Sequence, residues 1–132
     1  MDNKCNPLQV ARSLSQLWSP KVISEVDNHY VKVAKLKGHF VWHNHTEQDE
    51  LFLILQGSLV MEYEEEYEDR QVELNAGDLH VVPKGAMHNP YAAEECLVML
   101  IEDKGTAHTG DMESSGTRSI EEQLGSFVTE NR

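Results

Sequence analysis

The stretch GHFVWHNHTEQDELFLILQG, residues 38–57, contains two histidines two positions apart and a glutamate five positions after the second. A later stretch, GDLHVVPKGAMH at residues 77–88, ends on a third histidine after a turn rich in Pro and Gly. Three imidazoles and one carboxylate suit one divalent transition metal ion, namely Fe, Mn, Ni, Cu, Co or Zn. We therefore predict a metal site whose ligands are His43, His45, Glu50 and His88.

The spacing of these residues agrees with a common site. Residues two apart on a β-strand face the same side, so both histidines of a strand Phe40–His45 can point at one ion. Glu50 would face away on an unbroken strand, but the polar residues 46–49 predict a turn that brings it onto a neighbouring strand. Four protein ligands on a six-coordinate ion leave open positions, as in catalytic metal sites.

Most of the remaining chain is typical of short strands. Apolar or alternating segments bounded mainly by Gly, Pro, Asn or Asp predict strands at Val22–Val26, Tyr30–Leu36, Phe40–His45, Leu51–Leu55, Ser58–Tyr63, Arg70–Leu74, Asp78–Val82 and Cys96–Glu102. Many short strands without a long helix between them indicate an all-β sandwich or barrel. The runs Leu51–Leu55 and Leu97–Ile101 are apolar on both faces, so we expect a second protein layer, and a second subunit would supply it.

Helical signals occur only near the two ends. Asn6 and Pro7 suit the N-cap and first position of a helix that continues to Trp18 and ends at Ser19-Pro20. Ser119 and Glu122 have capping-box spacing and predict a short helix through Leu124. We expect an N-terminal helix or arm at 1–20, a barrel at 21–104, and a C-terminal loop with a short helix at 105–132.

The two stretches resemble the two sequence motifs of the cupin superfamily. Motif one, G-x5-H-x-H-x3,4-E-x6-G, is matched with one residue fewer after its first glycine by Gly38, His43, His45, Glu50 and Gly57. Motif two, G-x5-P-x-G-x2-H-x3-N, has Ala92 in place of its final Asn and is otherwise matched by Gly77, Pro83, Gly85 and His88. The resemblance, to small single-domain cupins like the mannose-6-phosphate isomerase relatives, implies a double-stranded β-helix (jelly-roll barrel), a metal ion in one mouth, and a homodimer.

Composition restricts the partners and the location. The 132 residues make one domain, and a formal charge of −12 from 23 acidic and 11 basic residues argues against nucleic acid or an anionic membrane as partner. Cys5 and Cys96 are far apart, and Cys96 is predicted to be a buried free thiol. Neither a signal peptide nor a bilayer-spanning run is visible, so we expect a soluble, cytoplasmic protein.

Several function classes remain open at this stage. A metal-dependent enzyme acting on a small polar molecule is favoured, and the resemblance implies a dioxygenase-like or a sugar isomerase-like reaction. A non-catalytic cupin that binds small molecules is the alternative, and a storage-like barrel would leave the ligand set unexplained. No catalytic acid or base can be assigned. Only Lys84 lies beside a ligand-bearing loop, which disfavours phosphosugars as substrates.

The other polar and aromatic residues near the motifs have weaker signals. Glu47 and Asp49 could form an entrance base, although a solvated turn is simpler. His39 could lie behind the ligands or at a strand edge, whereas structural or solvated roles are expected for His29, His80 and His108. Pocket-lining or core positions are both open for Tyr30, Phe52, Met61, Met87 and Tyr91.

Overall fold

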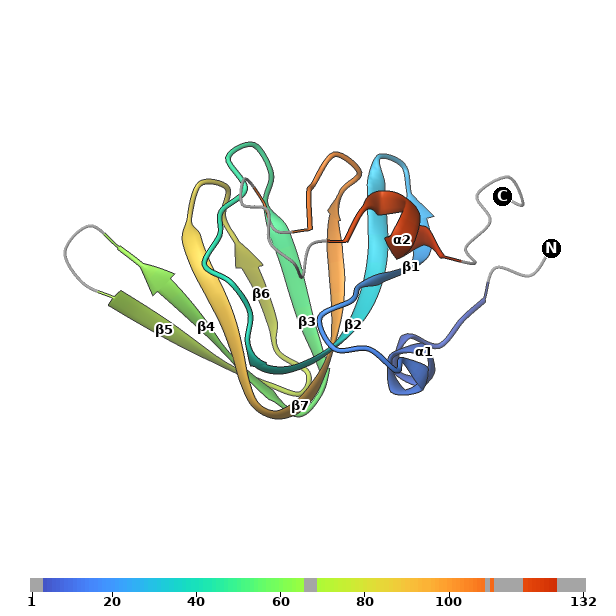
Figure 1. Cartoon of the computed structure of the whole chain (residues 1–132), viewed down its shortest axis with the longest axis horizontal. Coiled ribbons are helices and arrows are strands. Elements are labelled where there is room, and N and C mark those ends of the chain that lie inside the picture. The colour runs from blue at the N-terminus through green and yellow to red at the C-terminus, as the bar shows by residue number, and fades with distance from the viewer. Residues whose placement is uncertain (1–3, 66–68, 109, 111–117, 126–132) are drawn as a thin grey trace.

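The computed structural model describes residues 4–65, 69–108, 110 and 118–125 (Figure 1). Its two helices lie near the two ends of the chain, and the other elements are strands. In chain order the elements are α1 (Pro7–Ser13), β1 (Lys21–Val26), β2 (His29–His39), β3 (Glu50–Gln56), β4 (Ser58–Glu64), β5 (Asp69–Asn75), β6 (Leu79–Val82), β7 (Met87–Asp103) and α2 (Ile120–Leu124). The predicted all-β fold with short terminal helices is confirmed.

The strands pair antiparallel throughout and form two walls that share β7. One wall has the order β1-β2-β7-β3-β6, and the other pairs β5 with β4 and β4 with the first part of β7. Figure 1 shows β7 curving around the closed end, so that its two halves run up opposite walls. The loop that follows β6 and the bend at residues 46–49 before β3 lie at the other end (Figure 1).

Strand β7 begins much earlier than predicted. We expected a strand only over Cys96–Glu102, because Pro90 and the polar residues around it do not suggest one. The segment Met87–Tyr91 nevertheless pairs with β4, with Pro90 opposite Met61. Proline lacks an N–H, but its carbonyl accepts a hydrogen bond from the Phe40 N–H at 3.2 Å, so the position is still used in pairing.

The predicted strand Phe40–His45 is wrong. β2 ends at His39, and residues 40–49 form a loop that leads to β3. The first part of this loop lies along the edge of β7 opposite β4, but isolated contacts, such as the hydrogen bond from the Phe40 N–H to the Pro90 carbonyl, replace a regular ladder there. Within this loop His43 makes an isolated antiparallel bridge to His88. The N-terminal helix is also shorter than predicted: it stops at Ser13, and Leu17 and Trp18 instead contact the backbone of Lys35 on β2.

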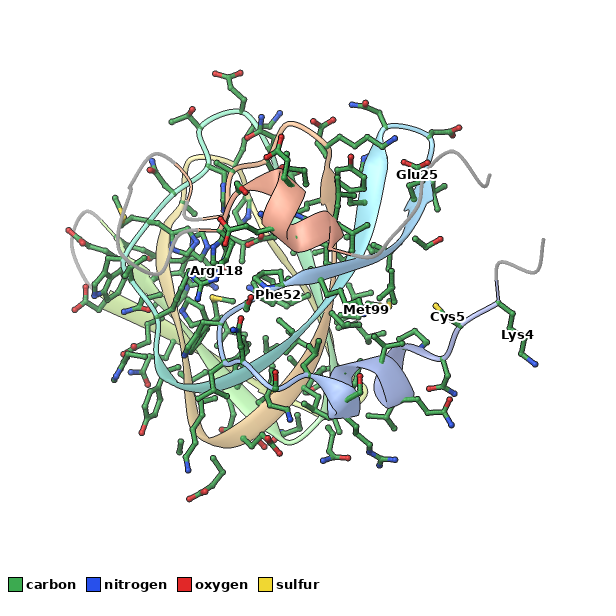
Figure 2. The ribbon with its side chains drawn as sticks, turned by 45° about the vertical axis from the view of Figure 1, so that its right-hand side comes forward. Lys4, Cys5, Glu25, Phe52, Met99 and Arg118 are labelled. Carbon is green, nitrogen blue, oxygen red and sulfur yellow. The ribbon has the colours of Figure 1, made fainter. Side chains whose placement is uncertain are left out.

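Apolar side chains form one cluster inside the walls and a second one outside. The interior cluster includes Phe52, and Figure 2 shows this ring directed into the fold. Outside, α1 packs its buried Ala11 against Val33 and Leu97, with Leu55 and Met99 at the edge. Helix α1 therefore supplies part of the second layer that we had expected from a second subunit.

Two smaller expectations are settled by the structure. Cys96 is a free thiol without solvent exposure, as predicted, and burial raises its pKa to about 11. Asn6 accepts a hydrogen bond from the Gln9 N–H, and Ser119 and Glu122 form the complete capping box of α2.

Among the described residues, no helix has the length and apolar composition needed to cross a membrane.

Candidate metal centre

The structure brings the four predicted ligands together. His43 and His45 lie in the loop between β2 and β3, Glu50 is the first residue of β3, and His88 is the second residue of β7. All four side chains are buried, and one potential ligand atom from each lies within 4.8 Å of the others. The polar bend at residues 46–49 turns the chain between the histidine pair and Glu50, as expected from the sequence.

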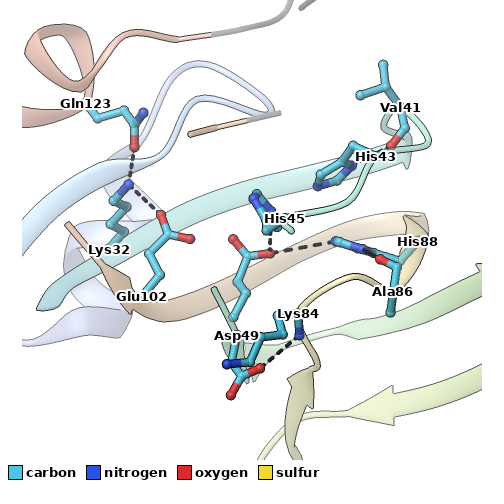
Figure 3. A network of polar contacts seen from close by, with 11 residues as sticks. Lys32, Val41, His43, His45, Asp49, Lys84, Ala86, His88, Glu102 and Gln123 are labelled. Atoms are coloured by element: carbon cyan, nitrogen blue, oxygen red, sulfur yellow. Dashed lines mark hydrogen bonds and ion pairs between the residues drawn. The ribbon is translucent and has the colours of Figure 1, made fainter. Parts of the chain in front are cut away.

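Backbone hydrogen bonds fix the two ligand-bearing loops to each other. His43 and His88 exchange both N–H···O bonds, at 3.0 and 2.9 Å, and the Gly85 N–H donates to the His45 carbonyl at 2.7 Å. The Asp49 carboxylate accepts from the backbone N–H of Lys84 at 2.8 Å (Figure 3). Asp49 therefore ties the loops together, a structural role in place of the entrance base considered from sequence.

Hydrogen bonds also determine which imidazole nitrogens face the site. The Nδ1 atoms of His43 and His88 lie 2.8 and 2.9 Å from the carbonyls of Val41 and Ala86. A carbonyl only accepts, so each Nδ1 carries the hydrogen and each Nε2 keeps its lone pair. This is how metal-binding histidines are oriented in proteins.

Within the part of the chain that the structure describes, two imidazole nitrogens of the cluster have no hydrogen-bond partner. Nε2 of His45 and of His88 are buried and unpartnered, and each lies near Glu50 Oε1, at 3.7 and 3.9 Å. Those separations are too long for hydrogen bonds. An unpaired buried polar atom costs about 1–3 kcal/mol, so the cluster is suited to a bound cation that uses these lone pairs.

The protonation states match a metal site. Burial, helped by the neighbouring His88, lowers the pKa of His43 to about 4, so its imidazole is neutral at pH 7. Burial alone would raise the pKa of Glu50, but the adjacent Glu102 carboxyl group and the imidazoles of His45 and His88 hold it well below its usual value. A neutral imidazole and an ionised carboxylate are the forms that bind metal ions.

A buried network behind Glu50 was missed in the sequence. Glu102 lies opposite Glu50 in the β3–β7 register, and its carboxylate pairs with the ammonium of Lys32 at 2.5 Å. Gln123 of α2 also hydrogen-bonds Lys32, as Figure 3 shows. Burial and the adjacent Glu50 charge raise the pKa of Glu102 well above its usual range. The sequence contained one indication of this position. Lys32, Ala34 and Leu36 are two apart on one strand and therefore face the same side, and Ala34 and Leu36 belong to the interior cluster.

The ligands lie beside a mostly apolar cavity. Its volume is about 40 Å³, it opens to solvent, and His43 and Glu50 are part of its lining. Trp18 and Phe40 stack in its wall at 4.8 Å between ring centroids, and His108 also lines it. Of the predicted pocket residues only Phe52 belongs to this lining, which does not include Tyr30, Met61, Met87 or Tyr91.

Three histidines outside the candidate ligand set differ in their surroundings. His39 is mostly exposed, stacks on Tyr91 and pairs with Glu62 at 3.1 Å, so it is a strand-edge residue and lies outside the ligand cluster. His80 lies 2.6 Å from the Tyr63 hydroxyl and has a structural partner, as expected. His108 differs from expectation, because the C-terminal segment brings it to the cavity.

Comparison of the sequence with known protein families supports this architecture. Residues 29–102, more than half of the chain, match the Cupin_2 family, the cupin domain. The chain belongs to the cupin family. Within this cupin the matched region contains all four candidate ligands.

Individual relatives support the assignment. The cupin is 30% identical over 104 residues to the uncharacterized protein YdbB of Bacillus subtilis, covering 79% of this chain and 89% of that protein. A solved cupin-2 domain protein from Shewanella frigidimarina shares 37% identity and superposes with a TM-score of 0.71, covering 76% and 95% of the two chains. Hydroquinone 1,2-dioxygenase from Sphingomonas sp. TTNP3 shares the fold at 16% identity and a TM-score of 0.66, over 79% and 75% of the chains.

The distances between the four candidate ligand atoms can be compared with those around a bound metal ion. Nitrogen and oxygen ligands lie about 2.0–2.2 Å from a zinc ion, so two ligands of one ion are at most about 4.4 Å apart. The spread of 4.8 Å in this cupin exceeds that limit only slightly. Binding one ion would therefore draw these side chains together by about half an ångström.

Proposed function

We propose that this cupin is a metal-dependent enzyme whose His43, His45, Glu50 and His88 hold one divalent transition metal ion. The observation that carries the proposal is the meeting of the buried ligand cluster with a cavity, since His43 and Glu50 belong to both. A metal ion placed there would lie beside the space that a small molecule can fill. Closed structural sites, in contrast, have all metal positions occupied by protein ligands.

The cavity lining indicates the class of substrate. Apart from His43, Glu50 and His108, the described side chains of the lining are largely apolar, and three of them, Trp18, Phe40 and Phe52, are aromatic. Apolar walls bind ligands by burying apolar surface, and flat aromatic groups favour a planar ligand. We propose a small, planar, largely apolar molecule with an oxygen-bearing edge, in place of the polar molecule expected from sequence.

A phosphosugar fits this lining poorly. The described residues that form the cavity include neither Lys nor Arg, the side chains that usually bind phosphate. Lys84 lines a different, outer groove together with Glu47 and Asp103. Of the two reactions that the cupin resemblance implies, the dioxygenase-like one is therefore the better match, and the isomerase-like one is not favoured.

The protein would contribute binding and orientation. A bound ion acts as a Lewis acid toward a substrate oxygen, and a redox-active ion can also activate dioxygen. The Val41 and Ala86 carbonyls hold two imidazoles in the metal-binding tautomer, and the buried Glu50 carboxylate offsets part of the ion's charge. The stacked rings of Trp18 and Phe40 exclude water from the side of the cavity.

The alternative is a cupin that binds the same kind of small molecule without converting it. The cavity and the ligand cluster support this reading equally, because both would serve binding. The two functions differ in turnover: an enzyme consumes dioxygen or substrate in proportion to its metal content, whereas a binding protein does not.

Elemental analysis of the purified full-length protein tests the proposal, with His88→Ala beside the wild type. We expect close to one metal ion per chain, reduced at least tenfold in the variant, since loss of one ligand weakens binding strongly. His39→Ala is the matched control, because it removes an exposed imidazole outside the cluster and should keep the metal. A wild type that stays metal-free after reconstitution would refute the enzyme proposal.

A further inference from the structure

Among the described residues that line the cavity, His108 is the titratable side chain that does not belong to the candidate ligand set. It lies in the turn that follows β7, and its ring is 5.1 Å from the ring of Phe40 in the cavity wall. An isolated polar group in an apolar pocket usually fixes the orientation of a ligand. A ligand in the cavity could form a hydrogen bond with one of the two nitrogens of this imidazole.

Hydrogen bonding leaves Nε2 for that role. The backbone N–H of Arg118 donates to Nδ1 of His108 at 2.8 Å, so Nδ1 carries the lone pair. In a neutral imidazole the other nitrogen then carries the hydrogen and is a donor. Burial, with the positive charges of Lys32 and Arg118, lowers the pKa of His108 to about 4, so the ring is neutral at pH 7.

A close backbone contact holds the turn of His108 against the ligand-bearing loop. Gly110 has a φ of +60°, and a Cβ atom added to it would lie 1.9 Å from the backbone oxygen of Asn44. Asn44 stands between the ligands His43 and His45. The turn therefore approaches this loop as closely as only a glycine permits, and His108 has a defined place relative to the metal cluster.

We infer that His108 donates a hydrogen bond from Nε2–H to an oxygen atom of a small planar ligand in this cavity. The inference rests on the proposed function and deepens it, since it adds a substrate-binding residue from the C-terminal segment to the four metal ligands. The metal ion would hold the ligand's oxygen-bearing edge, and His108 would select the orientation in which one oxygen faces the imidazole. A molecule without such an acceptor would leave the buried N–H unpaired.

A binding titration tests the inference on the full-length, zinc-loaded protein. The probe is 4-nitrocatechol, a small planar ring whose visible absorption changes when its hydroxyl groups ionise or coordinate a metal. The variants are His108→Leu, which removes the donor, His108→Gln, which restores an N–H donor, and His39→Leu, which removes an imidazole outside the cavity. The zinc content of each protein is measured alongside.

The inference predicts a specific pattern. His108→Leu should raise the Kd three- to tenfold, the usual effect of one neutral hydrogen bond, while His108→Gln and His39→Leu stay within about twofold of the wild type. Equal weakening in the Leu and Gln variants would mean a purely structural histidine and would overturn the inference. Unchanged binding in both would overturn it too.

Two further outcomes separate this inference from the proposed function. A wild type that holds zinc but does not bind the probe would overturn the inferred ligand class and leave the metal site standing. A wild type that does not hold zinc would refute the proposed function, and the inference would fall with it.

Discussion

Lys32 carries its ammonium group into the interior of the barrel, where it is 1% exposed. The charge is tolerated because Glu102 pairs with it and Gln123 accepts a hydrogen bond from it. Glu102 lies behind the candidate ligand Glu50, and the Lys32 ammonium offsets the charge of these two carboxyl groups. The residue thus links the C-terminal helix to the electrostatics of the candidate site.

Replacing Lys32 with methionine should destabilise the protein strongly. Breaking a buried ion pair by removing one partner costs about 3–5 kcal/mol, because Glu102 would then be buried either as an unpaired charge or as a protonated carboxyl group that has lost its ion pair. Urea unfolding of the metal-free protein measures the change. The control is the double variant Lys32→Met/Glu102→Gln, which removes both charges and should recover at least half of the loss. A single variant within 1 kcal/mol of wild type would contradict this account.

The pKa of His108 predicts a pH-dependent stability. The imidazole titrates near 6.5 in the unfolded chain and near 4 in the folded one, so the unfolded chain binds more protons between these values. Stability should therefore fall as the pH drops from about 6.5 to 4, by up to about 3 kcal/mol from this group. Chemical denaturation of the chelator-treated protein at pH 7, 5.5 and 4.5 measures it.

His108→Gln is the comparison for that series. Other groups titrate in the same range, and Glu102, with its raised pKa, contributes in the opposite direction. The difference between wild type and variant removes these shared contributions. We expect the difference in unfolding free energy to shrink or reverse toward acid pH. Parallel pH profiles would show that His108 does not titrate as the structure indicates.

Residues differ in how far their roles could be predicted from the sequence. The clustering of the four candidate ligands was predictable because the spacing of the motif residues is local. His108 was not, because it lies 20 positions after His88 and reaches the cavity through the contact of Gly110 with Asn44. Lys32 was not predicted to be buried because it is charged, although it shares a strand face with the interior residues Ala34 and Leu36.

Among the described residues, Gly110 in the turn after β7 makes an especially close backbone approach, to the oxygen of Asn44. Gly110→Ala should destabilise the protein, because the new methyl group would overlap the Asn44 oxygen and the positive φ is unfavourable for alanine. We expect a loss larger than the 1–2 kcal/mol that the positive φ alone costs. Urea unfolding measures it.

Gly125→Ala separates the two causes. Gly125 also has a positive φ, +51°, but its added Cβ would have only an ordinary contact, 3.7 Å from the Glu122 oxygen. This variant should show the cost of the backbone conformation alone. Equal losses in the two variants would mean that the turn does not depend on the close approach to Asn44.

Strands with a strong apolar pattern were predicted well, whereas the strand that contains Pro90 was not. β3 and β4 match their predicted ranges closely, since β3 is a continuous apolar run and Gly57 separates the two strands. The first half of β7 contains Pro90 and lacks such a pattern, and its pairing with β4 is a tertiary effect. His43 and His45 reach one site although their segment is a loop, because the exchange of hydrogen bonds between His43 and His88 replaces the expected strand.

The whole molecule presents an apolar outer sheet face that α1 covers only in part. Leu51 and Leu53 of β3 lie opposite Val81 and Leu79 of β6, and on the other side opposite Ile101 and Met99 of β7. Leu79 is 59% exposed and Val81 42%, and β6 is the last strand of its wall. Contiguous exposed apolar surface of this kind is typical of a protein–protein interface.

We predict that two copies of the chain associate through this face and form the homodimer expected from sequence. Apolar burial would stabilise the pair, whereas the charge of −12 on each copy opposes it, so association should strengthen as salt screens the repulsion. Light scattering after size exclusion should give twice the 15.0 kDa chain mass, and Leu79→Glu/Val81→Glu should give the monomer. The control, Val26→Glu, changes an equally exposed residue on β1 and should remain dimeric. A monomeric wild type at high salt, or a double variant that still dimerises, would rule out this interface.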